Sequence, residues 1–238
     1  MKSIRGMTAV ITGATSGIGE AAVRALCSEG VNTVISGRNA HKVRSIAQEL
    51  SCTGLAGDVT DPELPDRLLC AALETHGRCD ILINNAGVIV SGRIEEIDVG
   101  RVCRMVRVNV EAAFRMAYTF LKHFKQQHSG ELVNISSVMG KKTRETVGAY
   151  AGTKWALEAL SEALRMELSD TPIRITCIEP GLVRTELHRD WEVHPSDMMG
   201  IPNPLTPEDI AERIAWVLKQ PGHVRIPQML ILPQGHRV

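Results

Sequence analysis

The sequence predicts an α/β fold in which helices cover both faces of one parallel sheet. Short apolar runs rich in β-branched residues alternate with longer amphipathic segments along the chain, a pattern typical of strand–helix–strand units. The 238 residues, 44% of them hydrophobic, suffice for one large core. We therefore predict a single domain over residues 1–238, built on a doubly wound parallel sheet of about seven strands.

Seven runs are the expected strands, because their residues are apolar on both faces, as buried parallel strands require. They are Thr8–Ile11, Thr33–Ser36, Gly54–Gly57, Ile81–Ile83, Leu132–Ile135, Ile173–Ile178 and Met229–Leu232. The expected helices are the longer segments in which apolar residues recur with helical spacing. They are Gly19–Ser28, Ala40–Leu50, Pro65–Thr75, Val102–Gln126, Ala151–Leu168 and Pro207–Leu218.

One segment, residues 184–204, has no clear periodicity. Loops of this length are unusual inside compact domains and often close over a binding site. Trp191 and the adjacent Met198 and Met199 argue against full solvent exposure, because they would leave apolar area in water. We predict a substrate lid over 184–204; an unstructured surface insertion is the alternative.

Charge and composition exclude several classes of function. The 27 basic and 27 acidic residues are interspersed and give a formal net charge of 0, so no nucleic-acid partner is predicted. There is no apolar stretch of about 18 residues and no secretory signal pattern, so we expect a cytoplasmic protein without membrane association. The cysteines lack C-x-x-C spacing and the histidines lack ligand spacing, so free thiols and no metal site are expected.

The first expected strand runs into a glycine-rich turn that opens a helix. Glycine lets the backbone turn tightly and approach a ligand, and the free N–H groups at a helix start bind phosphate. The spacing is G-x-x-x-G-x-G rather than the more familiar G-x-G-x-x-G. The expected contacts of a dinucleotide diphosphate are Gly13, Thr15, Ser16, Gly17, Ile18 and Gly19.

This turn resembles the cofactor motif of the classical short-chain dehydrogenase/reductase family, and the resemblance extends from Thr12 to about Thr185. It implies a Rossmann-type domain that binds a nicotinamide dinucleotide. Further matches follow later strands, where ligands of open α/β sheets bind. The resemblance assigns Asp58 and Val59 to the adenine, Asn85, Ala86 and Gly87 of an Asn-Asn-Ala-Gly motif to the adenosine side, and Pro180, Gly181, Val183 and Thr185 to the nicotinamide carboxamide.

The end of the second expected strand indicates which dinucleotide is used. Many NAD-binding proteins place an acidic residue there to bond the ribose hydroxyls. This chain has Ser36-Gly37-Arg38 instead, and a guanidinium pairs with a 2′-phosphate that an acid would repel. We therefore predict NADP(H) rather than NAD; the alternative is that Arg38 only caps a surface turn.

Tyr150 and Lys154 are four residues apart on an expected helix, so both side chains lie on one face. An ammonium beside a phenol favours the phenolate and lowers the tyrosine pKa toward neutrality. By resemblance, Tyr150 is the proton donor and acceptor, Ser137 bonds the substrate oxygen, Lys154 also holds the cofactor ribose, and Asn109 holds a water of a proton relay.

These residues predict an NADP-dependent oxidoreductase that exchanges hydride between nicotinamide and a carbonyl or alcohol substrate, of the carbonyl reductase or 3-hydroxy acid dehydrogenase type. The alternatives are a 3-oxoacyl thioester reductase and a non-catalytic NADP-sensing protein. The basic residues Lys141, Lys142 and Arg144 either attract an anionic substrate or form a solvated turn. By resemblance, the partners are a small-molecule substrate and further copies of the chain, in a homotetramer or homodimer packed through Val102–Gln126 and Ala151–Leu168.

Overall fold

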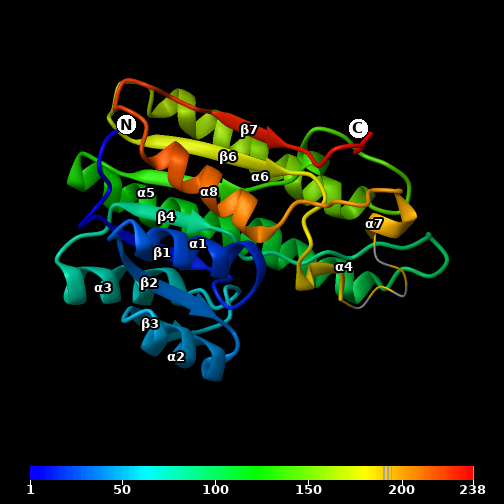
Figure 1. Cartoon of the computed structure of the whole chain (residues 1–238), viewed down its shortest axis with the longest axis horizontal. Helices are drawn as coiled ribbons and strands as arrows, with labels where there is room; N and C mark the ends of the chain where they lie inside the picture. The colour runs from blue at the N-terminus through cyan, green and yellow to red at the C-terminus, as the bar shows by residue number, and fades with distance from the viewer. Residues whose placement is uncertain (190, 192, 194, 238) are drawn as a thin grey trace.

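Seven parallel strands form one sheet in the computed structural model, which describes residues 1–189, 191, 193 and 195–237 (Figure 1). Their order is β3-β2-β1-β4-β5-β6-β7, which confirms the predicted doubly wound sheet. The strands are β1 (Thr8–Thr12), β2 (Asn32–Gly37), β3 (Thr53–Ala56), β4 (Ile81–Asn84), β5 (Glu131–Ile135), β6 (Arg174–Pro180) and β7 (Gln228–Ile231).

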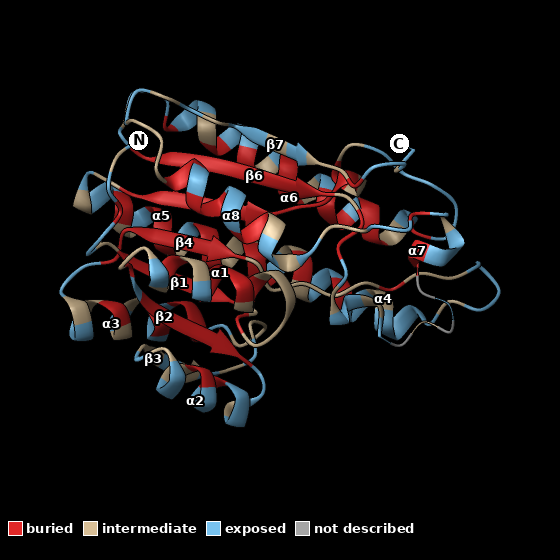
Figure 2. Cartoon of the chain, in the orientation of Figure 1, coloured by how far each residue is buried: buried red, intermediate tan, exposed pale blue. Residues whose placement is uncertain are grey.

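Successive strand residues bury on opposite faces of the sheet, and a separate hydrophobic core lies on each face. Ile11 joins the core beneath α1 (Gly17–Ser28), α2 (Ala40–Glu49) and α8 (Pro207–Leu218). Its neighbour Val10 joins the core beneath α3 (Leu64–His76), α5 (Ala113–Gln127) and α6 (Gly148–Glu167). Because both faces are covered, the central strands are buried along their length (Figure 2).

The two edge strands differ from the expectation that every strand is apolar and buried on both sides. In β3 and β7, half-buried residues alternate with exposed ones. An edge strand has a neighbour on one side only, and here one face of each strand remains open to solvent.

The predicted helix Val102–Gln126 is three consecutive pieces. α4 (Val99–Val106) begins earlier than expected, because the Asp98 side chain accepts a hydrogen bond from the Arg101 N–H and caps it. A π-helical turn, η1 (Arg107–Ala112), then precedes α5. Such turns insert one extra residue into a helix and recur at functional sites; this one carries Asn109.

The strand order reverses between β1 and β4, so the loops after these two strands diverge and leave a crevice, the usual ligand position in such sheets. Three short helices border the same edge: η2 (Val138–Gly140), η3 (Glu186–His188) and α7 (Pro195–Met198). The last two belong to the predicted lid, whose residues 190, 192 and 194 lie outside the described part. A bridge between Val183 and Leu205 joins the bases of this segment. No helix in the described part is both long and apolar enough to span a bilayer.

Candidate active site

A cavity of about 640 Å³ opens at the carboxyl ends of the central strands, within the size range of small-molecule sites. It brings together most of the residues that the sequence singled out. They are Gly13, Thr15, Ser16, Gly17, Ile18, Arg38, Asp58, Val59, Asn85, Ala86, Gly87, Ser137, Tyr150, Lys154, Pro180, Gly181, Val183 and Thr185. Gly19 and Asn109 are not among its lining residues and lie just behind it.

The start of α1 opens into this cavity without a side-chain cap. Ser16 occupies the N-cap position but makes no side-chain capping bond, whereas Asn39 and Thr206 cap α2 and α8. The first N–H groups of α1 therefore remain available at the positive end of the helix dipole. This is the arrangement that a dinucleotide diphosphate needs, so the residues present fit that group.

Two glycines of the turn are required by close packing. Gly13 has φ +63°, and a Cβ there would lie 2.8 Å from Asn85 Nδ2 and 2.9 Å from Ala86 Cα. A Cβ on Gly19 would collide with the Gly13 carbonyl oxygen. Gly19 thus serves the packing of helix against turn, which explains why it does not line the cavity.

Asn85 holds the turn in place through its side chain. Its Nδ2 donates to the carbonyl oxygens of Thr12 (2.9 Å) and Gly13 (3.2 Å). Thr12 Oγ1 in turn accepts from the backbone N–H groups of Asn85 and Ala86. The Asn85 side chain therefore braces the glycine turn from the end of β4, and the bracing hydroxyl of Thr12 was not predicted.

Arg38 lies at the cavity rim, directly after β2, and is exposed. Gly37 before it has no room for a side chain, since a Cβ would lie 2.7 Å from Thr15 Cγ2. Across the rim, the Thr60 N–H hydrogen bond lowers the pKa of Asp58, and the Arg38 charge adds to that effect. The rim therefore holds one cation and one ionised carboxylate.

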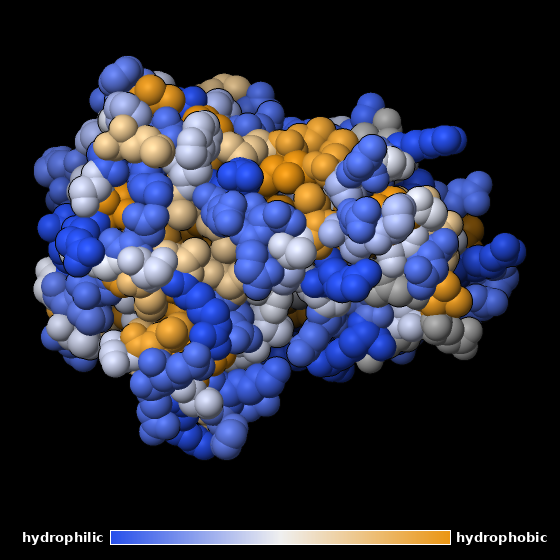
Figure 3. All heavy atoms as spheres, in the orientation of Figure 1, coloured by the Kyte–Doolittle hydropathy of each residue, from blue (hydrophilic) through white to orange (hydrophobic). Residues whose placement is uncertain are grey.

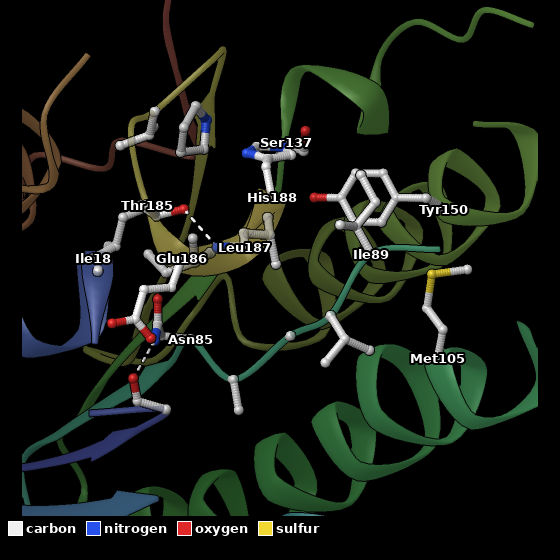
Figure 4. Close-up of a pocket in the computed structure, with 18 of the residues that line it drawn as sticks. Ile18, Asn85, Ile89, Met105, Ser137, Tyr150, Thr185, Glu186, Leu187 and His188 are labelled. Atoms are coloured by element: carbon white, nitrogen blue, oxygen red, sulfur yellow. Dashed lines mark hydrogen bonds between the residues drawn. The ribbon is translucent and has the colours of Figure 1, made fainter. Parts of the chain in front are cut away.

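At the other end of the cavity, the Tyr150 hydroxyl points into the space beside Ser137 and His188 (Figure 4). Tyr150 is 7% exposed and Ser137 8%. Burial raises the pKa of Tyr150 to about 12, and the Ser137 hydroxyl partly offsets this rise. The sequence predicted that Lys154 would lower this pKa. That expectation does not hold here, because Lys154 Nζ is 5.8 Å from the ring centroid and donates to the Ile135 carbonyl (2.8 Å).

Lys154 is itself buried, and burial lowers its pKa to about 8. The nearby Cys177 and Glu158 act in the opposite direction. A Cβ on Gly87 would lie 3.7 Å from Lys154 Nζ, so the Asn-Asn-Ala-Gly loop passes directly over the ammonium.

Asn109 comes from the π-turn η1 and is 2% exposed. Its side chain bonds both backbone groups of Val88, and its Nδ2 also donates to Thr153 Oγ1 at 3.1 Å. Thr153 Oγ1 donates onward to the Tyr150 carbonyl at 2.7 Å. Asn109 thus links the β4 loop to the helix that carries Tyr150.

Several cavity residues have no clear signal in the sequence. Arg101 and Arg104 reach it from α4, and His236 reaches it from the segment after β7. His236 Nδ1 accepts from the Leu182 N–H (3.4 Å), while burial and then the Arg144 charge lower its pKa. From the predicted lid segment, the cavity is also lined by Thr185, Glu186, Leu187, His188, Arg189, Trp191, Pro195 and Met199.

The three basic residues after η2 separate into different environments. Arg144 lines the cavity and donates to Met199 Sδ of the predicted lid segment at 3.2 Å. Lys141 instead pairs with Glu158 and Glu179 beneath the site, and Lys142 is exposed. Among the residues that the structure describes, no three or more His, Cys, Asp or Glu side chains gather as metal ligands would.

Comparisons with known proteins agree with this geometry. Residues 7–195 match the family model described as short chain dehydrogenase. An uncharacterized oxidoreductase of Staphylococcus aureus is 36% identical over 228 residues, which cover 94% of this chain and 96% of the relative. Another, from Staphylococcus epidermidis, is 32% identical over 235 residues, covering 98% and 100%.

Solved structures of the same architecture superpose over nearly the whole chain. The closed form of serine dehydrogenase complexed with NADP+ has a TM-score of 0.90 at 28% identity, covering 98% of this chain and 97% of that one. A 3-ketoacyl-(acyl-carrier-protein) reductase from Brucella melitensis complexed with NADH has a TM-score of 0.89 at 27% identity, covering 98% and 99%. The family match, the curated relatives and the shared fold together place this chain among the oxidoreductases of the short-chain dehydrogenase family.

Proposed function

We propose that the protein is an NADP-dependent oxidoreductase that exchanges hydride between nicotinamide and a carbonyl or alcohol substrate. The observation that carries this proposal is the composition of one cavity. The uncapped start of α1 and the Arg38 guanidinium lie at one end of it, and Ser137, Tyr150 and Lys154 at the other. A dinucleotide can extend from one end of this cavity to the other, with its phosphates at the start of α1 and its nicotinamide ring beside Tyr150.

Each side chain at the reactive end of the cavity has its own role in the reaction. When bound, the nicotinamide supplies or accepts the hydride. Ser137 Oγ donates a hydrogen bond to the substrate oxygen, and Tyr150 Oη gives that oxygen a proton in reduction or takes it back in oxidation. Lys154 binds the ribose hydroxyls of the cofactor. Burial keeps the Tyr150 phenol protonated at neutral pH, which is the form that reduction requires.

NADP is favoured over NAD by the residues after β2. Arg38 stands at the cavity rim, where NAD-binding folds commonly place an acid. The serine dehydrogenase was solved with NADP+, which supports this choice, whereas the Brucella reductase was solved with NADH. Strict discrimination requires that the 2′-phosphate of NADP approach Arg38 rather than Asp58.

An acidic substrate suits the reactive end of the cavity best. Arg144 and His236 both line it, and the acidic lining residues Asp58 and Glu186 belong to the cofactor side. A guanidinium recognises a carboxylate, so a 3-hydroxy acid or its 3-oxo counterpart is the favoured substrate class. The second candidate is a 3-oxoacyl thioester, as the name of the Brucella neighbour suggests.

Lid closure, assembly and location complete the proposal. Several described residues of 184–204, from Thr185 to Met199, line the cavity, which supports a substrate lid. Tyr118, Trp155 and Met166 are 46%, 50% and 66% exposed on α5 and α6, and Figure 3 shows apolar side chains gathered over the edge strand β7. Such surfaces support a homodimer or homotetramer. Gel filtration at micromolar concentration tests it, and a 26.0 kDa monomer would contradict it. A cytoplasmic location stays a prediction.

The decisive experiment follows NADPH oxidation by absorbance against a panel of aldehydes, ketones and 3-oxo acids. NADH and Tyr150→Phe are run alongside. We expect NADPH-dependent turnover that falls about 100-fold or more in the variant, with cofactor binding retained. Cofactor binding without turnover on any substrate would favour the NADP-sensing alternative, and binding of neither cofactor would refute the proposal.

A further inference from the structure

Two buried carboxylates and one half-buried ammonium lie together directly behind the reactive end of the cavity. Lys141 Nζ lies 3.4 Å from Glu158 Oε2 and 3.5 Å from Glu179 Oε1. Glu158 Oε2 also accepts from Gln228 Nε2 at 3.2 Å. Glu158 and Glu179 are 5% and 2% exposed, and none of the three charged residues lines the cavity.

Burying these charges lowers the stability of the fold unless partners compensate them. Burying a carboxylate costs several kcal/mol unless partners compensate it. Glu158 Oε1 is nevertheless buried without a hydrogen-bond partner in the described part of the chain, and so is Ser136 Oγ nearby. A Cβ on Gly140 would touch both residues, at 2.8 Å from Ser136 Oγ and 3.4 Å from Glu158 Oε1. An unsatisfied buried acid at this place calls for a reason other than packing.

The position of Glu158 supplies such a reason. Tyr150, Lys154 and Glu158 are spaced four residues apart on α6, and all three are buried on one face. Burial lowers the pKa of Lys154 to about 8, whereas Cys177 and Glu158 raise it. Burial raises the pKa of Cys177 to about 12, so its thiol is neutral at physiological pH. The anion that faces the ammonium from within α6 is therefore Glu158.

The other carboxyl of the cluster is the more easily neutralised one. Burial and then the Glu158 charge raise the pKa of Glu179, against the effect of Lys141. Glu179 is therefore the carboxyl of the cluster whose neutral form burial favours. The groups that face Glu158 are thus Lys154 on its own helix, Lys141 after η2, Cys177 and Glu179 on β6, and neutral Gln228 on β7.

The same cluster joins the three elements that carry the site. Lys141 follows η2, whose first carbonyl accepts from the Lys141 N–H, and Ser137 is the residue that precedes η2. Glu158 belongs to α6 with Tyr150, and Glu179 precedes Pro180 and Gly181 of the cavity wall. A shift of Lys141 would move the serine relative to the tyrosine.

Resting on the function proposed above, we propose that Glu158 is a positioning residue of the active site. Its buried carboxylate is the counter-charge that keeps the Lys154 ammonium protonated, and through Lys141 it ties the Ser137 loop to the helix of Tyr150. Glu158→Gln removes the charge and keeps the size of the side chain, so it is the informative variant.

The first test follows the protonation of Lys154 through the stability of the protein and needs no enzyme activity. Lysine has an ordinary pKa of 10.5, which burial lowers to about 8 in the folded protein. Between these values the unfolded chain binds more protons, so stability rises with pH across this window. Glu158→Gln removes a charge that raises the pKa of Lys154. In this variant the rise of stability with pH should therefore begin about one pH unit lower. Urea unfolding between pH 6 and 10 measures it.

A double-mutant cycle isolates the interaction between Glu158 and Lys154. In a Lys154→Met background, Glu158→Gln should no longer displace the pH dependence, because the titrating partner is gone. Glu162→Gln, on the exposed side of α6, is the matched control and should displace nothing. The same displacement in both backgrounds, or none in either, would overturn the proposal.

The second test uses turnover. With the best carbonyl substrate of the panel, the alkaline limb of kcat/KM for NADPH-dependent reduction should move to lower pH in Glu158→Gln, and Glu158→Asp should restore much of it. An unchanged pH profile in a merely destabilised Glu158→Gln protein would also overturn the proposal. Absence of turnover in the wild type would refute the proposed function instead, and the unfolding cycle would still decide the role of Glu158.

Discussion

Asn109 and Val88 are joined by two hydrogen bonds that run in opposite directions. Asn109 Oδ1 accepts from the Val88 N–H at 2.9 Å, and Asn109 Nδ2 donates to the Val88 carbonyl at 2.8 Å. The side chain thereby substitutes for a neighbouring strand and fixes the loop after β4. Since Gly87 of this loop passes over Lys154, the pair sets the floor of the cavity.

Removing this pair should affect both stability and turnover. Asn109→Ala leaves two partly buried backbone groups of Val88 without these partners, at a cost of at most about 1–3 kcal/mol each. We expect a lower urea midpoint and a drop in kcat/KM that persists after correction for the folded fraction. Gln127→Ala is the control, because Gln127 Nε2 also bonds buried backbone (Cys79 O, 3.0 Å) but at the far end of α5. Equal losses of turnover in both variants would contradict a local role for Asn109.

Gly87→Ala should separate cofactor binding from folding. The added Cβ would lie 3.5 Å from Asn109 Oδ1 and 3.7 Å from Lys154 Nζ, which is ordinary van der Waals contact. The free protein should therefore keep its thermal stability, while a methyl group on the cavity floor weakens NADPH binding by about 1–3 kcal/mol. NADPH fluorescence titration measures this loss. Gly19→Ala is the contrasting variant: its Cβ collides with the Gly13 carbonyl, so it should fail to fold stably. Unchanged NADPH affinity in Gly87→Ala would place the cofactor elsewhere.

Arg38→Ala should change cofactor preference. Loss of a charged hydrogen bond to the 2′-phosphate raises the KM for NADPH about tenfold or more, while the KM for NADH, which lacks this phosphate, stays nearly constant. Steady-state kinetics with both cofactors measures the ratio. Arg44→Ala removes the same charge from the exposed surface of α2 and should leave the ratio unchanged. A parallel loss with both cofactors would assign Arg38 to the adenine or to the turn.

The fold was predictable because buried parallel strands are continuous apolar runs, and the observed strands begin and end within one or two residues of the expected ones. The π-turn at Asn109 was not predictable, since its apolar spacing resembles that of an ordinary helix and the extra residue is stabilised by distant Val88 and Thr153.

The parts of the candidate site that lie within a short sequence motif, such as the glycine turn, could be predicted from the sequence. The rest depends on segments far apart in the chain. His236 reaches the cavity only because the chain after β7 returns to Leu182. Lys141 separates from Lys142 and Arg144 because its half-buried ammonium pairs with the buried carboxylates of Glu158 and Glu179. Neither contact has a local pattern.

Reduction should decline at alkaline pH. In the free enzyme, burial sets the pKa of Lys154 at about 8 and that of Tyr150 at about 12. Above pH 8 the ammonium loses its proton first, while Tyr150 still carries the proton that reduction needs. The profile of kcat/KM, which reports the free enzyme, should therefore bend downward near pH 8. A profile flat to pH 10 would show that Lys154 charge does not matter.

The opposite end of the sheet holds a buried ion pair that should govern stability and not turnover. Arg174 and Glu131 open β6 and β5, with Arg174 Nη2 2.6 Å from both Glu131 oxygens. Arg174 also donates to the carbonyls of Leu218, Gln220 and Val224. Arg174→Met leaves the carboxylate with Lys2 alone, so we expect a loss of about 3–5 kcal/mol in urea unfolding. Arg24→Met, which breaks exposed pairs with Glu20 and Glu49, should cost about 1 kcal/mol or less.

The double variant Glu131→Gln with Arg174→Met should recover part of this loss, because the cost of Arg174→Met alone is mostly an uncompensated buried charge. Specific activity of the folded fraction should match the wild type in all these variants, since the pair lies at the amino ends of the strands and the cavity at their carboxyl ends. Additive losses in the double variant would mean that the pair contributes through packing and the carbonyl bonds of Arg174, with little contribution from charge.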